Sequence, residues 1–387
     1  FKIVAVYAPA LDSAGLTLAT VQNDAPFNYA DGRPVSNWYS TGYRGLNSLR
    51  EGIRESMNII AVKTLTQISP QLGFDYLKNF GFTTLVDREE ITVNGKTEIF
   101  SDIQQSLALG GVTYGVTNEE LNAAYATIAN GGTYIKPKLY TKVLDHDGNV
   151  VLDNTLPQSR QVIKETTAWL LTDAMVDVVT TGTGASVNFG NMAMAGKTGT
   201  TSDYNDVWFS GYTPYYTASV WTGYDNNTKL RQGEERNLAK RLWRACMSKI
   251  HEELPSQSFQ MPANRIVTAT VCSKSGKLPI PGLCDGTIRS EYFAEGTVPT
   301  ESCNVHYQGF VCPYSNLPAN DPCPFKVQGV LELTPPEDAS LLQGSGTVPA
   351  EPITQEVTNP DGTVSTITIP QANTNTCIHT FEYMAQP

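Results

Sequence analysis

Two neighbouring stretches decide the fold of this chain: Met194-Ala195-Gly196-Lys197-Thr198-Gly199-Thr200-Thr201 and Asp206-Val207-Trp208-Phe209-Ser210-Gly211-Tyr212. The second is rich in aromatic and β-branched residues, and a similar run over 215–224 follows it, so the pair predicts a β-hairpin. Lys-Thr-Gly occurs once in the sequence, and on an edge strand it offers a cation, hydroxyl donors and a glycine backbone. Such an edge suits a carboxylate and a developing oxyanion, although an ordinary turn into a strand is the alternative. Candidate site residues are therefore Lys197, Thr198, Gly199 and Thr200.

Helical patterns surround this hairpin. Apolar residues recur at helical spacing over 46–67, 117–129 and 166–179, and Asn130-Gly131-Gly132 is a stop signal for the second helix. An amphipathic pattern over 237–253 would cover the sheet. Alternating helices and strands predict an α/β domain up to about residue 255.

The helical pattern over 46–67 is interrupted at Ser56-Met57-Asn58. A hydroxyl and an amide that leave a core helix pair can face a cleft, so Ser56 and Asn58 are candidate site residues. Ser186-x-Asn188 and Ser302-x-Asn304 share the pattern, but neither interrupts an apolar helix. The alternative for Ser56 is a helix N-cap beside a surface asparagine.

Composition argues against a nucleic-acid-binding protein and against a membrane-spanning segment in this sequence. The chain has 387 residues, 27 basic against 38 acidic, with a net charge of -11 and no Lys/Arg-rich run, so nucleic acid is not an expected partner. No stretch approaches the roughly 18 to 20 consecutive apolar residues that span a bilayer. Because Phe1-Lys2-Ile3-Val4 opens directly on an apolar helical pattern without methionine, we expect a fragment of a longer protein.

Cysteines are confined to the C-terminal part of the chain. Cys246, in an apolar helical pattern, is expected to be a buried thiol. Six more lie in the last third, and their spacing favours disulfides of unassigned pairing in a secreted context. No Cys-x-x-Cys pair is present and only Cys303 with His306 has metal-like spacing, so no metal and no cofactor is expected. The six are Cys272, Cys284, Cys303, Cys312, Cys323 and Cys377.

Ser-x-x-Lys, Ser-x-Asn and Lys-Thr-Gly, in that order, form the signature of penicillin-binding proteins and serine β-lactamases. The sequence resembles this pattern, with Lys2 as the lysine of the first motif. The serine would then lie two positions before Phe1, outside this sequence, so we expect the nucleophile to be missing. Flanking stretches resemble the transpeptidase domain of class A, bifunctional penicillin-binding proteins over about residues 1–255. They are 7–12, 37–39 with 43–45, 107–111 with 114–117, 124–126 with 129–132, and 182–184.

The resemblance implies an α/β fold of the penicillin-binding protein and serine β-lactamase type. An antiparallel sheet of about five strands would have helices on both faces, with a helical lobe beside it. It also implies peptidoglycan D,D-transpeptidation by serine acyl transfer, with peptidoglycan stem peptides as substrates and β-lactams as covalent inhibitors. A membrane anchor and a glycosyltransferase domain would precede this region, at the extracytoplasmic face of the bacterial membrane.

The same resemblance implies a role for each candidate residue. Lys2 would be the general base, Ser56 would relay the proton, and Lys197 would keep the local potential positive. Asn58 would hold the substrate amide. The hydroxyls of Thr198 and Thr200 would bind the terminal carboxylate, and the Thr200 N–H would serve the oxyanion hole.

The predicted domains are a transpeptidase domain over 1–257, a cysteine-bearing extension over 258–333, and a Pro/Gly/Ser/Thr-rich tail over 334–387. The tail is either a linker or a small β-rich piece. Two alternatives to the transpeptidase remain open. One is a D,D-carboxypeptidase or β-lactamase of the same superfamily, and the other is a non-catalytic scaffold that retains the fold.

Overall fold

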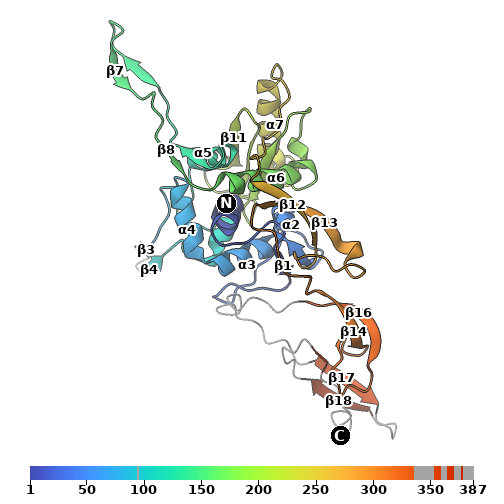
Figure 1. The fold of residues 1–387 in the computed structure, drawn as a ribbon. Helices are drawn as coiled ribbons and strands as arrows, with labels where there is room; N and C mark the ends of the chain where they lie inside the picture. Colours follow the sequence, from blue (N-terminus) through green and yellow to red (C-terminus); the bar gives the residue numbers. More distant parts are fainter. Residues whose placement is uncertain (94–95, 335–352, 359–363, 370–375, 378–387) are drawn as a thin grey trace.

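A computed structural model describes residues 1–93, 96–334, 353–358, 364–369 and 376–377 (Figure 1). It places a sheet and its helices beside a helical lobe, and small β-sheets extend from this body toward the C-terminus. Among the residues so described, no helix is both long and apolar enough to cross a membrane.

The central sheet contains the predicted hairpin. Strands β9 (Ala195–Thr200), β10 (Asp206–Tyr212) and β11 (Thr217–Gly223) are antiparallel, in the order β11-β10-β9. The expectation of about five strands is wrong for the described residues, because this sheet has three strands. The later strands pair with one another instead of extending it.

Helices cover both faces of this sheet. α5 (Asn118–Ala129) and α6 (Glu165–Thr180) pack on one face, and α7 (Leu238–Ile250) packs on the other. The fully buried Trp243 anchors α7, and its Nε1 donates to the Ala218 carbonyl at 3.0 Å. The prediction for Cys246 is wrong: it lies on the exposed side of α7, because only one stripe of this short amphipathic helix faces the sheet.

The helical lobe is built around the start of the chain. A π-helical segment η1 (Lys2–Tyr7) continues into α1 (Ala8–Asp12), and residues 3–8 are completely buried. The interrupted helical pattern is confirmed as α2 (Leu49–Arg54) and α3 (Asn58–Ile68). Two further segments complete the lobe, α4 (Pro70–Asn79) and the 3-10 helix η2 (Gln105–Leu109).

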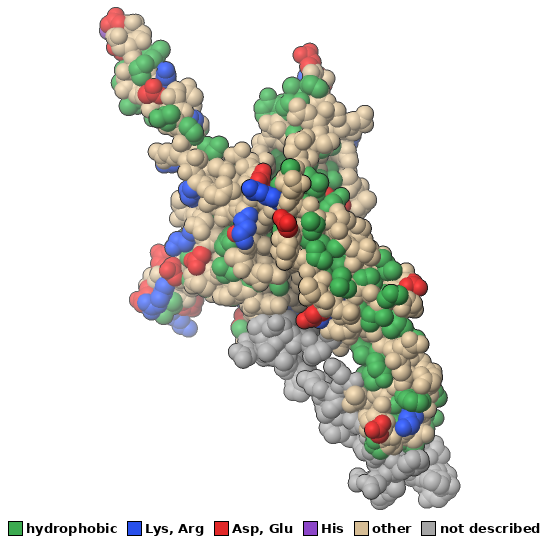
Figure 2. Space-filling view, viewed as in Figure 1, with side chains coloured by type: hydrophobic (Ala, Val, Ile, Leu, Met, Phe, Trp, Pro, Cys, Tyr) green, Lys and Arg blue, Asp and Glu red, His purple; other side chains and the backbone are tan. Residues whose placement is uncertain are grey.

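The remaining strands form small antiparallel sheets. In the first 161 residues the pairs are β1 (Val21–Asp24) with β2 (Gly45–Ser48), β3 (Glu89–Val93) with β4 (Lys96–Phe100), β5 (Thr133–Ile135) with β8 (Ser159–Gln161), and β6 (Lys142–Leu144) with β7 (Val150–Asp153). The β6–β7 hairpin projects from the body, and Figure 2 shows hydrophobic side chains along this arm.

The C-terminal extension consists of separate hairpins and a small sheet. β12 (Ile266–Cys272) pairs with β13 (Ile288–Ala294), and β14 (His306–Cys312) lies between β15 (Leu317–Pro318) and β16 (Val327–Glu332). In the predicted tail, β17 (Ile353–Thr358) pairs with β18 (Val364–Ile369). The β-rich alternative therefore holds for these residues, and the rest of the tail lies outside the described residues.

The expected disulfides are not formed among Cys272, Cys284 and Cys303, nor between Cys323 and Cys377. Cys272, Cys284 and Cys303 are buried free thiols. The sulfurs of Cys323 and Cys377 are 3.6 Å apart, whereas a disulfide bond measures about 2.05 Å. The prediction failed because it relied on spacing along the chain, while the fold gathers sulfurs from separate turns into clusters.

Candidate active site

Lys2 meets the Ser56-Met57-Asn58 turn directly. Its Nζ donates to the Ser56 carbonyl at 2.6 Å and to Asn58 Oδ1 at 2.6 Å, and it lies 3.2 Å from Ser56 Oγ. The first two predicted motifs, which are more than fifty residues apart, therefore form one cluster. A neutral amine has two N–H bonds and one lone pair, so donation to both oxygens still leaves the lone pair for a proton.

The helix break at Ser56 has a local cause. Ser48 caps α2 by accepting from Glu51 N at 3.3 Å, and α2 ends after only six residues at Arg54. Ser56 has a φ of +54°, in the left-handed region that side chains with a Cβ avoid at a cost of roughly 1 to 2 kcal/mol. This conformation turns the chain between two core helices and exposes the Ser56 hydroxyl and carbonyl to Lys2.

Asn37 supports the site, although the sequence analysis assigns it no role. Its Oδ1 accepts from Asn58 N at 2.9 Å and from Ile59 N at 3.3 Å, so it caps α3 in place of Met57, which has no capping side chain. Asn58 Nδ2 donates to the Ser36 carbonyl at 2.8 Å. These bonds fix the backbone and the amide orientation of Asn58, which leaves its Oδ1 for Lys2.

A buried carboxylate holds the loop that carries Asn37. Asp24 is completely buried and accepts from Asn37 Nδ2 at 2.7 Å, from the Tyr39 hydroxyl at 2.6 Å and from Arg44 N at 2.8 Å. In the sequence alone, the stretch 37–39 stands out only by its resemblance to a known family. A signal was nevertheless present, since an asparagine in a loop is a common helix-capping residue.

Lys197 lies on β9, at the sheet side of the site. The side chain is 3% exposed, and its Nζ is 3.3 Å from Thr198 Oγ1. Thr198 Oγ1 also lies 3.0 Å from Thr183 Oγ1, a second hydroxyl that the sequence did not identify as a site residue. Burial lowers the pKa of Lys197 to about 7.

The other β9 residues differ in exposure and in how closely they pack against β10. Thr200, at the end of the strand, is exposed. A Cβ on Gly199 would lie 3.1 Å from Trp208 Cβ on the neighbouring strand, and one on Gly196 would lie 2.6 Å from the Phe209 ring. Glycine therefore lets β9 pack closely against β10 at both positions.

The two groups of candidate residues interact through charge. Burial, and next the charge of Lys197, lower the pKa of Lys2 well below its ordinary value. Lys2, Ser56 and Asn58 are in mutual contact, whereas Lys197 reaches this cluster through its electric field. The arrangement can place a neutral Lys2 amine beside the Ser56 hydroxyl, while the positive charge of Lys197 disfavours protonation of that amine.

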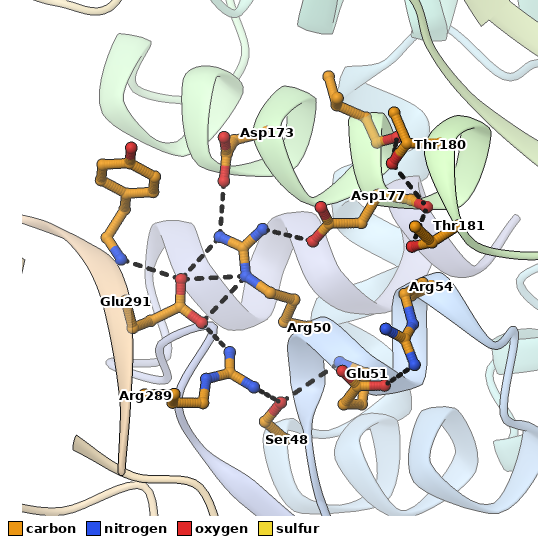
Figure 3. Close-up of polar contacts among 12 residues, drawn as sticks. Ser48, Arg50, Glu51, Arg54, Asp173, Asp177, Thr180, Thr181, Arg289 and Glu291 are labelled. Carbon is orange, nitrogen blue, oxygen red and sulfur yellow. Dashed lines mark hydrogen bonds and ion pairs between the residues drawn. The ribbon is translucent and has the colours of Figure 1, made fainter. Parts of the chain in front are cut away.

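An ion-pair network around Arg50 connects α2 and α6 to the C-terminal extension (Figure 3). Arg50 of α2 bonds Glu291 of β13 at 2.6 Å, Asp173 of α6 at 2.6 Å and Asp177 at 2.7 Å. Arg289 also pairs with Glu291. Glu291 is 2% exposed, and although its burial opposes ionisation, bonds from Arg50 and the nearby arginine charges hold its pKa below the ordinary value.

These features define an α/β domain in which a lysine and a Ser-x-Asn turn of the helical lobe lie near a Lys-Thr-Gly strand of the sheet. Residues 1–248 match the family model described as the penicillin binding protein transpeptidase domain, and residues 262–308 match the penicillin-binding protein 1A, C-terminal domain. The chain belongs to the penicillin-binding protein transpeptidase family.

Similar proteins include penicillin-binding protein 1A of Clostridium botulinum strain Hall, 36% identical over 320 residues that cover 79% of this chain and 37% of that protein. Penicillin-binding protein 1A of Clostridium tetani is 34% identical over 79% of this chain and 39% of its own length. The chain thus spans less than half the length of these relatives. The crystal structure of penicillin-binding protein 1A from Haemophilus influenzae has the same fold, with a TM-score of 0.64 and 23% identity over 78% of this chain and 48% of that chain.

Proposed function

We propose that this chain is the transpeptidase part of a peptidoglycan synthase and that it cross-links stem peptides by serine acyl transfer. The substrate would be a peptide ending in D-Ala-D-Ala, and β-lactams would acylate the same residue. The observation that carries the proposal is the contact of Lys2 Nζ with Ser56 and Asn58 while the charge of Lys197 disfavours protonation of Lys2. A solved relative, PonA1 from Mycobacterium tuberculosis, is described in complex with penicillin V, which agrees with this ligand class.

In the proposed mechanism, a serine three residues before Lys2 attacks the penultimate D-Ala carbonyl carbon. Lys2 Nζ accepts the hydroxyl proton as the O–C bond forms. When the amide C–N bond breaks, Ser56 Oγ passes a proton from Lys2 to the departing D-Ala amine. An acceptor amine then attacks the ester carbon and loses a proton to Lys2 Nζ. As the ester C–O bond breaks, Lys2 passes that proton to the departing serine Oγ, which restores the free hydroxyl.

The remaining candidate residues would bind the substrate. The hydroxyls of Thr198 and Thr200 would hold the terminal carboxylate, with Lys197 as the nearby cation, and Asn58 would hold the substrate amide. Gly199 would let the peptide backbone lie close to β9. The Thr200 N–H would donate to the oxyanion, where one such donor is worth about 3 to 4 kcal/mol of transition-state stabilisation.

The whole parent protein would carry a glycosyltransferase domain and a membrane anchor upstream, and would act at the extracytoplasmic face of the bacterial membrane. The names of the Clostridium relatives and their greater length support this placement. The proposal also includes the domain limits: a transpeptidase domain over 1–257, a cysteine-bearing extension over 258–333 and a tail over 334–387.

The test is covalent labelling of the full-length parent with a fluorescent penicillin, located by peptide mass spectrometry. We expect one label, on the serine two positions before Phe1, with a labelling rate that rises with pH as Lys2 loses its proton. Lys197→Met should slow labelling and move the pH profile upward, because the Lys2 pKa rises when the neighbouring charge is removed. A folded parent that stays unlabelled at every dose would favour the scaffold alternative. Rapid release of the label by water would favour a β-lactamase, and release of D-Ala without cross-linking would favour a carboxypeptidase.

A further inference from the structure

We propose that Cys272, Cys284, Cys303 and His306 bind one structural Zn²⁺ ion in the C-terminal extension. Their four ligand atoms lie within 4.8 Å of one another, and the three cysteines are buried. They come from four places: the end of β12, the turn before the 3-10 segment η5 (Asp285–Thr287), a loop, and the start of β14. The proposal does not rest on the proposed catalytic function, because none of the four residues belongs to the candidate active site.

The distances agree with a tetrahedral zinc site. His306 Nδ1 lies 3.5 Å from Cys272 Sγ, 3.3 Å from Cys284 Sγ and 3.4 Å from Cys303 Sγ. With Zn–S bonds of about 2.3 Å and Zn–N bonds of about 2.0 to 2.1 Å, the sulfur-to-nitrogen edge of a tetrahedron is about 3.5 Å. The three sulfur-to-nitrogen distances therefore match the edges of such a tetrahedron, and the three sulfurs lie within 4.8 Å of one another.

Hydrogen bonds around the sulfurs suit thiolates. Ile280 N donates to Cys284 Sγ at 3.2 Å, while Val305 N and His306 N donate to Cys303 Sγ at 3.4 and 3.5 Å. The Thr287 hydroxyl lies 3.4 Å from Cys272 Sγ. Each sulfur thus has a polar neighbour outside the ligand set, as the supporting groups around protein metal ligands commonly do.

The donor set and its burial indicate the metal and its role. Three thiolates and one imidazole in a tetrahedron select zinc among common metals, and four protein ligands leave no open position for a reacting water. A disulfide would join only two of the three sulfurs and would leave the third beside His306. The ion would therefore be structural.

The site would fasten the extension to the body. The turn that follows Cys272 packs on the helical lobe, since a Cβ on Gly276 would lie 2.2 Å from the Ala19 carbonyl oxygen. β13, which pairs with β12, carries Glu291 and Arg289 of the Arg50 network. Metal binding would stabilise the strands that make both contacts.

Spacing along the chain does not indicate zinc, because no Cys-x-x-Cys pair is present. The separations within this set are large except for Cys303 and His306, and only the fold brings the ligands together. A second cluster of Cys312, Cys323 and Cys377 has three sulfurs within 4.8 Å of one another. The proposal does not extend to it, but the experiment has to separate the two clusters.

The test is to purify the full chain under reducing conditions and to measure its zinc content by inductively coupled plasma mass spectrometry. We expect Cys303→Ser and His306→Ala to lose one Zn²⁺ per chain relative to wild type. The exposed Cys246→Ser and the second-cluster variant Cys323→Ser should keep that ion. His306→Cys should also keep it, and after Co²⁺ replacement its absorption bands should shift toward those of a four-thiolate site. Equal zinc content in wild type and both ligand variants would overturn the proposal.

A second measurement needs no variant, in case the substituted chains do not fold. Titration of wild type with p-hydroxymercuribenzoate, with a zinc-sensitive dye present, should release Zn²⁺ as the thiols react. If the thiols of wild type react without releasing zinc, or if alkylation of freshly reduced and zinc-supplied protein finds two of Cys272, Cys284 and Cys303 oxidised to a disulfide, the assignment is wrong.

Discussion

Lys197→Met tests the electrostatic account of the site through stability. Burial lowers the pKa of Lys197 from 10.5 to about 7, so the folded chain gives up a proton that the unfolded chain keeps until about pH 10.5. A tenfold difference in proton affinity between the folded and unfolded states corresponds to about 1.4 kcal/mol. Burial of the charged Lys197 side chain therefore lowers the free energy of unfolding by about 5 kcal/mol at or below pH 7. Between the two pKa values the unfolded state binds more protons, so stability rises with pH across this window and the cost falls to about 2 kcal/mol at pH 9.

The apolar Met side chain has a similar length and removes this cost. Urea unfolding, followed by tryptophan fluorescence at pH 6 and pH 9, should show a variant more stable than wild type by up to about 5 kcal/mol at pH 6. The gain should be smaller at pH 9. Lys249→Met is the matched control, because Lys249 is exposed on α7 and its replacement should leave the pH dependence unchanged. A variant no more stable than wild type at pH 6, or an equal gain at both pH values, refutes the reasoning.

Three further predictions concern the supports of the site. Glu291→Gln leaves Arg50 without its most buried partner and should lower the free energy of unfolding by about 3 kcal/mol, measured by urea unfolding; an unchanged midpoint would contradict the network's role. Asn37→Ala removes the cap of α3 and should cost about 1 kcal/mol and slow penicillin labelling of the parent; normal labelling would show that the Asn58 amide needs no such support. Ser56→Gly should be more stable than Ser56→Ala by about 1 kcal/mol, because glycine accepts the positive φ. Both variants lack the hydroxyl, so penicillin should label both equally slowly. Faster labelling of the glycine variant would show that backbone strain, and not loss of the hydroxyl, slows the alanine variant.

The parts of the fold that could be predicted are those with local signals. The hairpin of β10 and β11, helices α5 and α6, and the break between α2 and α3 follow from periodicity, caps and turn residues. The pairing of Lys2 with Ser56 and Asn58 was anticipated through motif order, and the contacts in the structure agree with it.

The parts that could not be predicted depend on contacts between distant segments. Arg50 and Glu291 are 241 residues apart, and nothing in either neighbourhood indicates the other. Asn37 looks like any loop asparagine until the fold places it at the start of α3. The sulfur clusters depend on distant contacts in the same way, because the fold and not the spacing along the chain sets the distances between the sulfurs.

The short helix α2 connects the extension to the turn at Ser56. Arg289 of β13 donates to Ser48 Oγ at 3.0 Å, and Glu291 of the same strand pairs with Arg50. Both side chains therefore bind the start of α2. Six residues later the chain reaches Ser56, whose carbonyl and hydroxyl meet Lys2. A shift of β13 would therefore move the base of the turn that orients the proposed general base. Under the proposed mechanism, the position of the Ser56 turn therefore depends on bonds from β13, although none of the proposed catalytic residues lies in the extension (Figure 3).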